Sequence, residues 1–200
     1  MSANRRAAQK AATRETLRQA GRACFAEKGY AATQIGDVAR AAGVAHGTFY
    51  VHFASKETLA DELLAAFNAE TARRVGERLL GGSLQTRVQG AAEAFLGHWH
   101  EDASMVRCYA ERMGAAIELE ALRDGVNPPA FDLLGGALQM LAAERGVEGD
   151  FTLVTQALLA MWLRIGLQSL FNEAVSREFA TQTLVALSIA SIEAALGSSA

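Results

Sequence analysis

The sequence predicts an all-α protein of about nine helices. Half of its 200 residues are hydrophobic, which is enough apolar material for a large core. The chain has only two prolines, and few of its segments place β-branched residues at alternate positions, which is the pattern typical of a strand. Apolar residues recur mainly three and four positions apart, which is the period of a helix.

The amino-terminal part predicts a helix followed by a shorter one. The first covers residues 8–28 and ends at Gly29, and four apolar side chains share one of its faces: Leu17, Ala20, Cys24 and Phe25. The Thr33 hydroxyl is expected to cap a second helix that begins at Gln34. Its buried face holds Ile35, Val38 and Ala39. Gly43 then supplies the left-handed backbone that a sharp turn requires.

A third, equally short helix is expected over residues 45–51. Val44 and Phe49 lie on its inner side, and its outer side carries His46, Thr48 and Tyr50. Helices this short are marginal in water on their own, so the first helix must serve as their platform. Two short helices joined by a glycine turn are typical of a helix-turn-helix DNA-binding motif.

A long helix is predicted from residue 56 to about residue 80. Ser55 is its expected N-cap, and Gly81 and Gly82 are expected to end it. Its buried side chains are Leu59, Leu63, Leu64 and Phe67. Together with the three preceding helices it makes a DNA-binding unit with a connecting fourth helix.

Glycine, proline and capping residues divide the rest of the chain into five more helices. We expect them at residues 84–100, from Asp102 or Ser104 to about Leu122, and at residues 130–145, 151–171 and 177–196. Asn127, Pro128 and Pro129 mark a turn before the third of these helices, and Gly146 and Gly149 end it. Asp150 is the expected cap of the helix that follows.

Several segments at fixed spacing carry a family resemblance. They are FAEKGY at 25–30, Thr33, DVA at 37–39, AAGVA at 41–45, GTFY at 47–50, HF at 52–53 and SKE at 55–57. This pattern resembles the amino-terminal domain of the TetR family of bacterial transcriptional regulators. The resemblance implies a DNA-binding domain at residues 11–71, with its motif at 34–53, and an effector-binding and dimerisation domain at residues 72–200.

The resemblance also implies which residues contact DNA. Thr33, Tyr50, His52 and Lys56 would hold phosphates, and His46, Gly47, Thr48 and Val51 would lie against base edges. Each has a structural alternative: Thr33 as a cap only, Tyr50 and His52 as packing residues, and Gly47 as a site of close backbone approach. We expect Thr48 and Lys56 to be exposed. Ala45 and His46 depart from the family, which often has a capping serine and then a lysine or arginine there.

Charge divides the chain in the same way. Residues 1–60 hold nine Lys or Arg against four Asp or Glu, a net charge of +5, whereas the remaining residues carry −8, which together give the overall −3. Clustered positive charge favours binding to the phosphate backbone of DNA. Arg5, Arg6, Lys10 and Arg14 are therefore either a solvated basic segment or an arm that contacts phosphates or the minor groove.

The last two helices, near residues 150–171 and 177–196, predict a homodimer. The final helix has one apolar stripe of Val185, Ile189, Ile192 and Leu196, and a second of Leu184, Leu187, Ser191 and Ala194. A helix with two apolar sides needs two partners, and the resemblance implies that the second partner is the same helix pair of another copy. The alternative is a self-contained core.

A small-molecule effector is expected to bind between the long helix and the helix at 151–171. The candidate lining residues are Trp99, Met105, Tyr109, Met113, Met140, Met161 and Trp162, with His98, Arg107 or Arg164 as polar anchors. The alternative is that this apolar stripe is ordinary core. In the family, a ligand in this region moves the DNA-binding domains through the long helix, which would change the spacing of two readers on a palindrome.

The sequence offers no basis for an enzyme, a metal site or a cofactor. His98 and His100 would project about 200° apart on a helix, and the sequence has no phosphate-binding glycine loop, nucleophile elbow or paired-cysteine motif. Cys24 and Cys108 suit a reducing cytoplasm. The apolar run at 153–171 contains Gln156, Arg164 and Gln168, so we expect no membrane span.

These observations predict a cytoplasmic, dimeric repressor, nucleoid-associated when DNA-bound, that binds a palindromic operator on double-stranded DNA and is released by a small molecule. Three alternatives remain open from the sequence. They are a transcriptional activator, a non-specific architectural DNA-binding protein, and a helical small-molecule-binding protein or enzyme.

Overall fold

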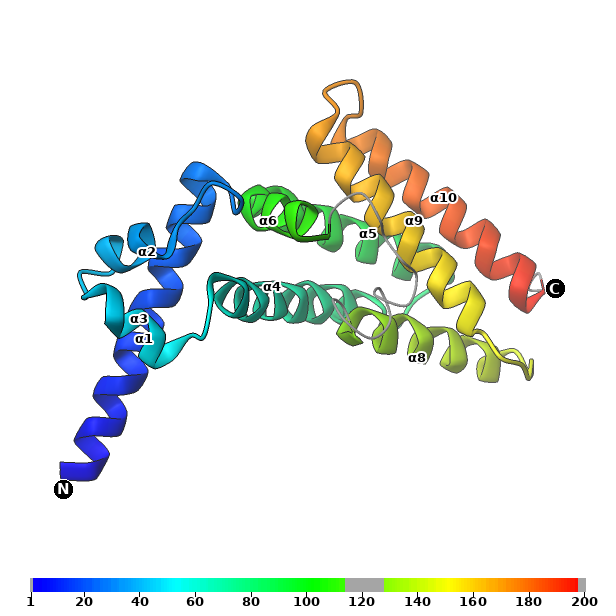
Figure 1. The fold of residues 1–200 in the computed structure, drawn as a ribbon. Coiled ribbons are helices and arrows are strands. Elements are labelled where there is room, and N and C mark those ends of the chain that lie inside the picture. Colours follow the sequence, from blue (N-terminus) through cyan, green and yellow to red (C-terminus); the bar gives the residue numbers. More distant parts are fainter. Residues whose placement is uncertain (1, 114–127, 198–200) are drawn as a thin grey trace. The chain divides into compact units, whose positions relative to one another are not determined.

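The computed structural model describes residues 2–113 and 128–197 (Figure 1). Within these residues it contains nine α-helices and no strand, which confirms the all-α prediction. The helices are α1 (Ser2–Lys28), α2 (Ile35–Ala41), α3 (His46–His52), α4 (Lys56–Arg78), α5 (Leu84–Glu101), α6 (Ala103–Met113), α8 (Pro128–Glu144), α9 (Thr152–Phe171) and α10 (Arg177–Leu196). The predicted end of the sixth helix at Leu122 and the predicted turn residue Asn127 lie outside the described residues.

The chain forms two compact units. Unit 1 comprises Met1–Ala66 and Ser104–Ala115, and unit 2 comprises Phe67–Ala103 and Ala116–Ala200. The long helix α4 therefore contributes its first half to unit 1 and its second half to unit 2. Nearly all of α6 belongs to unit 1, whereas the sequence analysis assigned every residue after 71 to the second domain.

Unit 1 has a core of large apolar side chains contributed by each of its helices. α1 packs against α2, and α2 packs against α3. The fully buried side chains include Leu17, Phe25, Val38, Phe49 and Leu59. These residues are the predicted inner faces of the first four helices, so the helical spacing in the sequence identified this core correctly.

Two glycines shape the connections of unit 1 as predicted. Gly29, after α1, has a φ of 80°, and Gly43, between α2 and α3, has a φ of 67°. Residues with a Cβ rarely adopt this backbone. The predicted cap of α2 is wrong, because the helix begins at Ile35 and the Asp37 carboxylate accepts a hydrogen bond from the Gln34 N–H at 3.1 Å.

Unit 2 is a bundle in which α10 packs against α5 and α9, and α8 packs against α9 (Figure 1). The hydroxyl groups of Ser83 and Ser176 cap α5 and α10. The prediction that Pro128 and Pro129 form a turn is wrong, because both begin α8. Proline suits this position, since the first turn of a helix does not use its N–H groups. Asp150 accepts from the Thr152 N–H at 2.9 Å, but the N-cap of α9 is Phe151.

Close packing of α5 against α9 depends on a glycine. A Cβ on Gly166 would lie 2.8 Å from two ring carbons of Trp99 and 3.0 Å from the Phe95 ring. The Trp99 ring also packs against Phe95, with centroids 4.5 Å apart. Trp99 is therefore a core residue at the contact of these two helices.

Two helices of unit 2 are long and apolar enough to cross a membrane by length and composition. These are α9 and α10, with mean hydropathies of 1.3 and 1.5. Core helices of soluble proteins pass the same test, so the finding is weak evidence for a span. Arg164 is exposed in the middle of α9, where a lipid-facing charge would be costly.

Candidate nucleic-acid interface and ligand pocket

Helix α3 presents one side to solvent and is anchored by the other. Phe49 and the following Phe53 are 0% and 1% exposed, so they fix the helix on unit 1. The outward-facing residues are His46, Gly47, Tyr50 and Val51. Of these, Tyr50 is 52% exposed and Val51 is 65% exposed. Thr48 is half-buried, although the sequence analysis expected it to be exposed. The outer face of α3 thus brings together most of the predicted base-contacting residues.

The amino-terminal end of α3 has no side-chain cap. Ala45 occupies the N-cap position with extended backbone and makes no capping hydrogen bond. A serine there would accept a hydrogen bond from the first turn, and the loss of such a cap costs about 1 kcal/mol. Because Ala45 stands where the family often has a serine, α3 begins without a side-chain cap.

Lys56 is not the free side chain that the sequence analysis expected. Its ammonium group donates hydrogen bonds to the carbonyl oxygens of Tyr30 at 2.8 Å and Thr33 at 2.9 Å. It also lies 4.3 Å from the centroid of the Tyr30 ring. The expectation was wrong because the loop between α1 and α2 turns its carbonyl groups toward the start of α4, and Lys56 ties the two together.

Thr33 also has a structural role. Its side chain is 1% exposed, and its hydroxyl donates to the carbonyl oxygen of Gly29 at 2.7 Å and contacts that of Cys24 at 3.2 Å. The hydroxyl therefore closes the end of α1 instead of capping α2. A side chain in this position has no open face for a phosphate.

Arg14 has a structural role in unit 1, whereas the sequence left open whether it is solvated or contacts DNA. Its guanidinium donates to the His52 carbonyl oxygen, pairs with Glu62, and lies 4.2 Å from the centroid of the Phe53 ring. It thereby attaches the end of α3 to α1 and α4. The half-buried His52 imidazole has its pKa lowered by burial and by the nearby cations Lys10 and Arg14.

A hollow of about 530 Å³ lies beside α3 in unit 1. It brings together four of the predicted contact residues, namely Thr33, His46, Tyr50 and Lys56. The Glu57 carboxylate also lines it and accepts a hydrogen bond from the Tyr30 hydroxyl at 3.1 Å. An acidic side chain here disfavours a phosphate inside the hollow and favours contacts along the outer face of α3.

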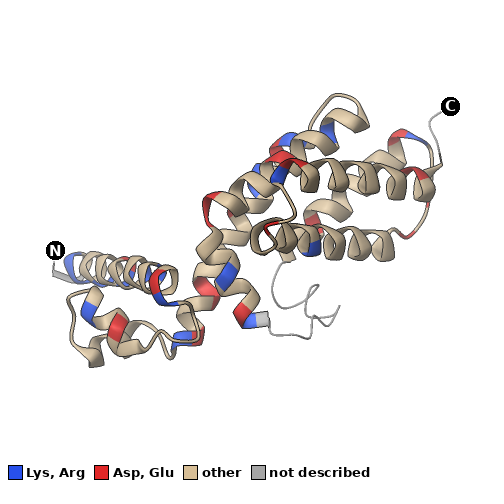
Figure 2. Ribbon diagram, turned by 90° about the horizontal axis from the view of Figure 1, so that it is seen from above, with Lys and Arg blue, Asp and Glu red and all other residues tan. Residues whose placement is uncertain are grey.

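Exposed positive charge lies on the first part of α1, as Figure 2 shows for unit 1. Arg5, Arg6 and Lys10 are all exposed there. Arg40, in α2, has a side chain that is 79% exposed and pairs with Asp37 at 3.3 Å. Unit 1 therefore keeps cations available for a polyanion, although Arg14 and Lys56 are used within the fold.

Helix α6 joins unit 1 through polar and apolar contacts. The Glu111 carboxylate accepts from the Ala31 N–H at 2.9 Å, and Arg112 pairs with Asp61 in α4. Burial raises the pKa of Cys108 and of Tyr109 to about 12. Met105 and Tyr109, predicted as ligand contacts, are buried and belong to unit 1.

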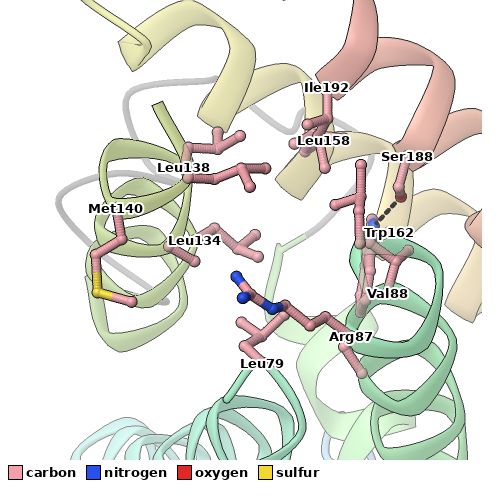
Figure 3. A pocket seen from close by; sticks show the side chains of 14 residues that line it. Leu79, Arg87, Val88, Leu134, Leu138, Met140, Leu158, Trp162, Ser188 and Ile192 are labelled. Carbon is pink, nitrogen blue, oxygen red and sulfur yellow. Dashed lines mark hydrogen bonds between the residues drawn. The ribbon is translucent and has the colours of Figure 1, made fainter. Parts of the chain in front are cut away.

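Unit 2 contains an apolar pocket with a cavity volume of about 60 Å³ (Figure 3). We call it the apolar pocket. Side chains from α5, α8, α9 and α10, together with Leu79, line it: Leu84, Arg87, Val88, Ala91, Leu134, Ala137, Leu138, Met140, Leu141, Leu158, Trp162, Ser188 and Ile192. Of the predicted ligand residues whose side chains are described, only Met140 and Trp162 are in this lining.

The remaining predicted ligand residues lie elsewhere. Trp99 is core, Met161 is half-buried, and Arg164 is exposed on α9. The His98 imidazole stacks on Phe67 with centroids 4.7 Å apart, and burial lowers its pKa. Arg107, in α6, is exposed. The side chain of Met113 lies outside the described ones.

Sequence reasoning missed Arg87 and Ser188. Arg87 sits among Leu84, Val88 and Ala91, so a lone cation on an apolar stripe was the signal that could have identified it. The Ser188 hydroxyl is 2% exposed and accepts a hydrogen bond from the Trp162 indole N–H at 2.9 Å. Among the described residues, no group of three or more His, Cys, Asp or Glu could hold a metal ion.

Comparison with known proteins identifies the amino-terminal part. Residues 17–63 match the family model of the bacterial regulatory proteins of the tetR family. The HTH-type transcriptional repressor KstR2 of Mycobacterium tuberculosis is 48% identical over 54 residues, which are 27% of this chain and 27% of that protein. The HTH-type transcriptional repressor DhaR of Mycobacterium sp. strain GP1 is 34% identical over 71 residues, 36% of each chain. These matches span only about a quarter to a third of either relative.

Solved structures match over most of the chain. The regulator FadR of Bacillus subtilis, in complex with stearoyl-CoA, has a TM-score of 0.69 at 19% identity and covers 93% of this chain and 99% of its own. A TetR-family regulator of Streptomyces coelicolor has a TM-score of 0.58 at 19% identity, covering 90% and 94%. At this identity the likeness concerns the fold. Residues 17–63 therefore match the tetR family of bacterial regulatory proteins, and the chain as a whole is similar in fold to solved regulators such as FadR.

Proposed function

We propose that this protein is a ligand-responsive transcriptional repressor that binds operator DNA through α3. The exposed outer face of α3, on a unit anchored by Phe49 and Phe53, carries the proposal. A helix fixed on one side and open on the other can enter the major groove and read base edges. The exposed basic start of α1 supplies the electrostatic attraction to DNA.

The proposed contacts follow from the position of each residue on α3 or α1 and from its chemistry. His46, Gly47, Thr48 and Val51 face base edges, and Tyr50 and His52 contact phosphates. Arg5, Arg6 and Lys10 add contacts to the backbone from α1. Thr33 and Lys56 leave this set, because they hold the loop between α1 and α2.

A homodimer formed through α9 and α10 accounts for apolar side chains that unit 2 leaves exposed. Leu153, Phe171, Phe179 and Leu187 are 74%, 48%, 60% and 47% exposed. Ser191 and Ala194, from the second predicted stripe, are exposed beside them, whereas Leu184 is buried. A second copy would cover these groups and would place two α3 helices about 34 Å apart, one turn of DNA.

The small-molecule response belongs to unit 2 in this proposal. The FadR structure with stearoyl-CoA shows that one protein of this fold takes up a ligand with an acyl chain. A ligand in the apolar pocket would change the packing of α5 and α8 and, through α4, the spacing of the two readers. We place the protein in the bacterial cytoplasm, on the nucleoid when it is bound to DNA.

Footprinting on the DNA that flanks the gene tests this function. We expect a protected palindrome whose half-sites are one helical turn apart, and higher expression of the adjacent gene when the repressor is deleted. A fall in expression would instead identify an activator. Protection without sequence preference would identify an architectural protein, and no retardation of any flanking DNA would refute the proposal.

Two variants separate base reading from phosphate contact. Thr48→Ala should change the preference at one position in each half-site, at a cost of about 1–3 kcal/mol for the preferred base. Lys10→Gln should weaken binding to all sequences alike and lower the salt slope by about 1. Equal and sequence-neutral losses from both variants would contradict the assignment of Thr48.

A further inference from the structure

We propose that the apolar pocket binds a monoanionic ligand with an unbranched or compact apolar body and one terminal carboxylate, which Arg87 receives. The inference deepens the proposed function, since it names the chemical class of the effector. It depends on two properties of the pocket in unit 2, namely the lining and the partners of Arg87.

The lining fits an apolar body. Among the part of the chain that the structure describes, fourteen residues line the pocket; twelve of them are Leu, Val, Ile, Ala, Met or Trp, and the other two are Arg87 and Ser188. The Trp162 N–H already donates to the Ser188 hydroxyl at 2.9 Å, which leaves no unsatisfied indole N–H in the wall. Such a surface would gain about 25 cal/mol for each Å² of apolar ligand area that it removes from water.

Arg87 is the single cation among the described residues of this lining, and its hydrogen-bonding capacity is mostly unused. Its Nε donates to the Gly82 carbonyl oxygen at 3.0 Å. Its Nη1 lies 3.4 and 3.5 Å from the two carboxylate oxygens of Glu144, at the limit of a hydrogen bond. A guanidinium has five N–H donors. The hydrogen bonds above use Nε and Nη1, so the two donors on Nη2 have no partner among the described residues.

The position of the guanidinium favours a ligand over a purely structural role. Its side chain is only 21% exposed, and Figure 3 shows it reaching from α5 toward Leu134 on α8, between apolar side chains. A cation beside apolar groups lacks the hydration that it has in water and gains most from a charge-assisted, bidentate partner. A carboxylate has the geometry for that pairing.

The neighbouring Glu144 sets the charge of the ligand. Its side chain is 50% exposed, so it can return to water when a ligand takes its place beside Arg87. The site has one arginine and one glutamate. A monoanion that replaces Glu144 leaves Arg87 paired with one negative charge, as before, whereas a dianion would bring a second negative charge that has no cationic partner. A cationic ligand would instead be repelled by Arg87.

The size of the cavity predicts that the pocket widens on binding. A volume of about 60 Å³ holds only a short apolar group, well below the roughly 300 Å³ of a typical ligand site. Met140 can move, because it is 54% exposed and methionine has three rotatable side-chain bonds. Ligand binding should therefore displace α8 side chains before it reaches the buried Trp162.

Calorimetric titration of the purified protein with octanoate, octan-1-ol and octylammonium at pH 7.5 tests the inference. The three probes share one apolar chain and differ in the head group. We expect octanoate to bind at least about tenfold more tightly than the other two, as a charge-assisted hydrogen bond of about 1.4 kcal/mol implies. Equal affinities, or no saturable binding of octanoate, would overturn the proposal.

Four variants locate the site. Arg87→Gln should weaken octanoate binding about tenfold or more and change octan-1-ol binding less than about threefold. Arg164 is an exposed arginine of the same unit, and Arg164→Gln should change the binding of neither probe. Glu144→Gln should tighten octanoate binding, because it removes the competing carboxylate. Ala137→Phe should block both probes by filling the pocket. Circular dichroism verifies that each variant is folded, and unchanged octanoate affinity in Arg87→Gln would refute the role of Arg87.

These titrations contain no DNA, so they fail or succeed independently of operator binding. A protein that binds octanoate through Arg87 but retards no flanking DNA would refute the proposed function and support the site. A protein that protects an operator but binds no octanoate would refute the site and leave the repressor function standing.

Discussion

Lys56 in unit 1 and Arg87 in unit 2 are two cationic side chains in opposite situations. Lys56 donates to two carbonyl oxygens within 2.9 Å and lies over the Tyr30 ring. Arg87 has one good hydrogen bond and a carboxylate at 3.4 Å. The contrast teaches that a basic residue near a functional surface is available to a ligand only when the fold does not already use its donors.

The same contrast separates the two units. In unit 1, Arg14 and Lys56 hold α1, α3, α4 and the loop before α2 together, so part of the positive charge of this unit is structural. The charge that remains available is on the outside of α1. In unit 2, Arg87 of the apolar pocket is held more loosely, by one hydrogen bond at 3.0 Å and a carboxylate oxygen at 3.4 Å.

Lys56→Met is the strongest test of this contrast. It removes charge-assisted hydrogen bonds to the Tyr30 and Thr33 carbonyls, each worth about 1.5–3 kcal/mol, so unit 1 should lose about 3 kcal/mol of stability or more. Urea unfolding followed by circular dichroism measures the loss, and hydrogen exchange assigns it to the loop between α1 and α2. Arg40→Met, which removes an exposed ion pair, is the control and should cost less than about 0.5 kcal/mol. Equal, small losses would show that Lys56 is as free as the sequence suggested.

The sequence predicted unit 1 well because its signals there are local. Leu17, Phe25 and Phe49 were placed in the core from helical spacing alone, and Gly43 was placed in the turn from backbone sterics. Lys56 and Thr33 were not predicted correctly, because their partners are carbonyl groups of a loop. Carbonyl groups are present at every residue, so no sequence pattern marks the ones that a fold will turn inward.

The pocket was harder to predict because it requires the packing of four helices. Met140 and Trp162 were selected for their side-chain type, and so was Trp99, which the approach of α5 to Gly166 buries in the core. Met105 and Tyr109 are both buried on α6, but they belong to unit 1 and do not line the apolar pocket. Periodicity gives the face of a helix, and only tertiary structure gives its partner.

Gly47→Ala sharpens the comparison on the DNA-binding side. A Cβ at Gly47 would meet nothing within 4 Å, so the variant should be as stable as the wild type or up to about 1 kcal/mol more stable. If the backbone of α3 approaches base edges at this position, the same methyl group should reduce operator affinity about tenfold, measured by gel retardation. Gly136→Ala adds a methyl group at an equally open position in α8 and should leave DNA binding unchanged. Unaltered operator affinity in Gly47→Ala would remove Gly47 from the interface.

The smallest expected effect concerns the histidines whose pKa is lowered by burial, which are His52 in unit 1 and His98 and His100 in unit 2. For His98, burial and Arg74 lower the pKa, and Glu70 and Glu101 act in the opposite direction. Below about pH 6.5 the unfolded chain protonates His98, whereas the folded unit keeps its imidazole neutral. The free energy of unfolding is therefore largest above pH 6.5 and decreases as the pH falls below it. His98→Phe keeps a ring against Phe67 but binds no proton, so unit 2 should lose less stability between pH 7.5 and pH 5.5 than the wild type does. Urea unfolding followed by tryptophan emission measures this difference, since Trp99 and Trp162 both belong to unit 2. An equal acid sensitivity of the two proteins would mean that His98 is protonated within the folded unit, and that its burial is less complete than its stacking on Phe67 indicates.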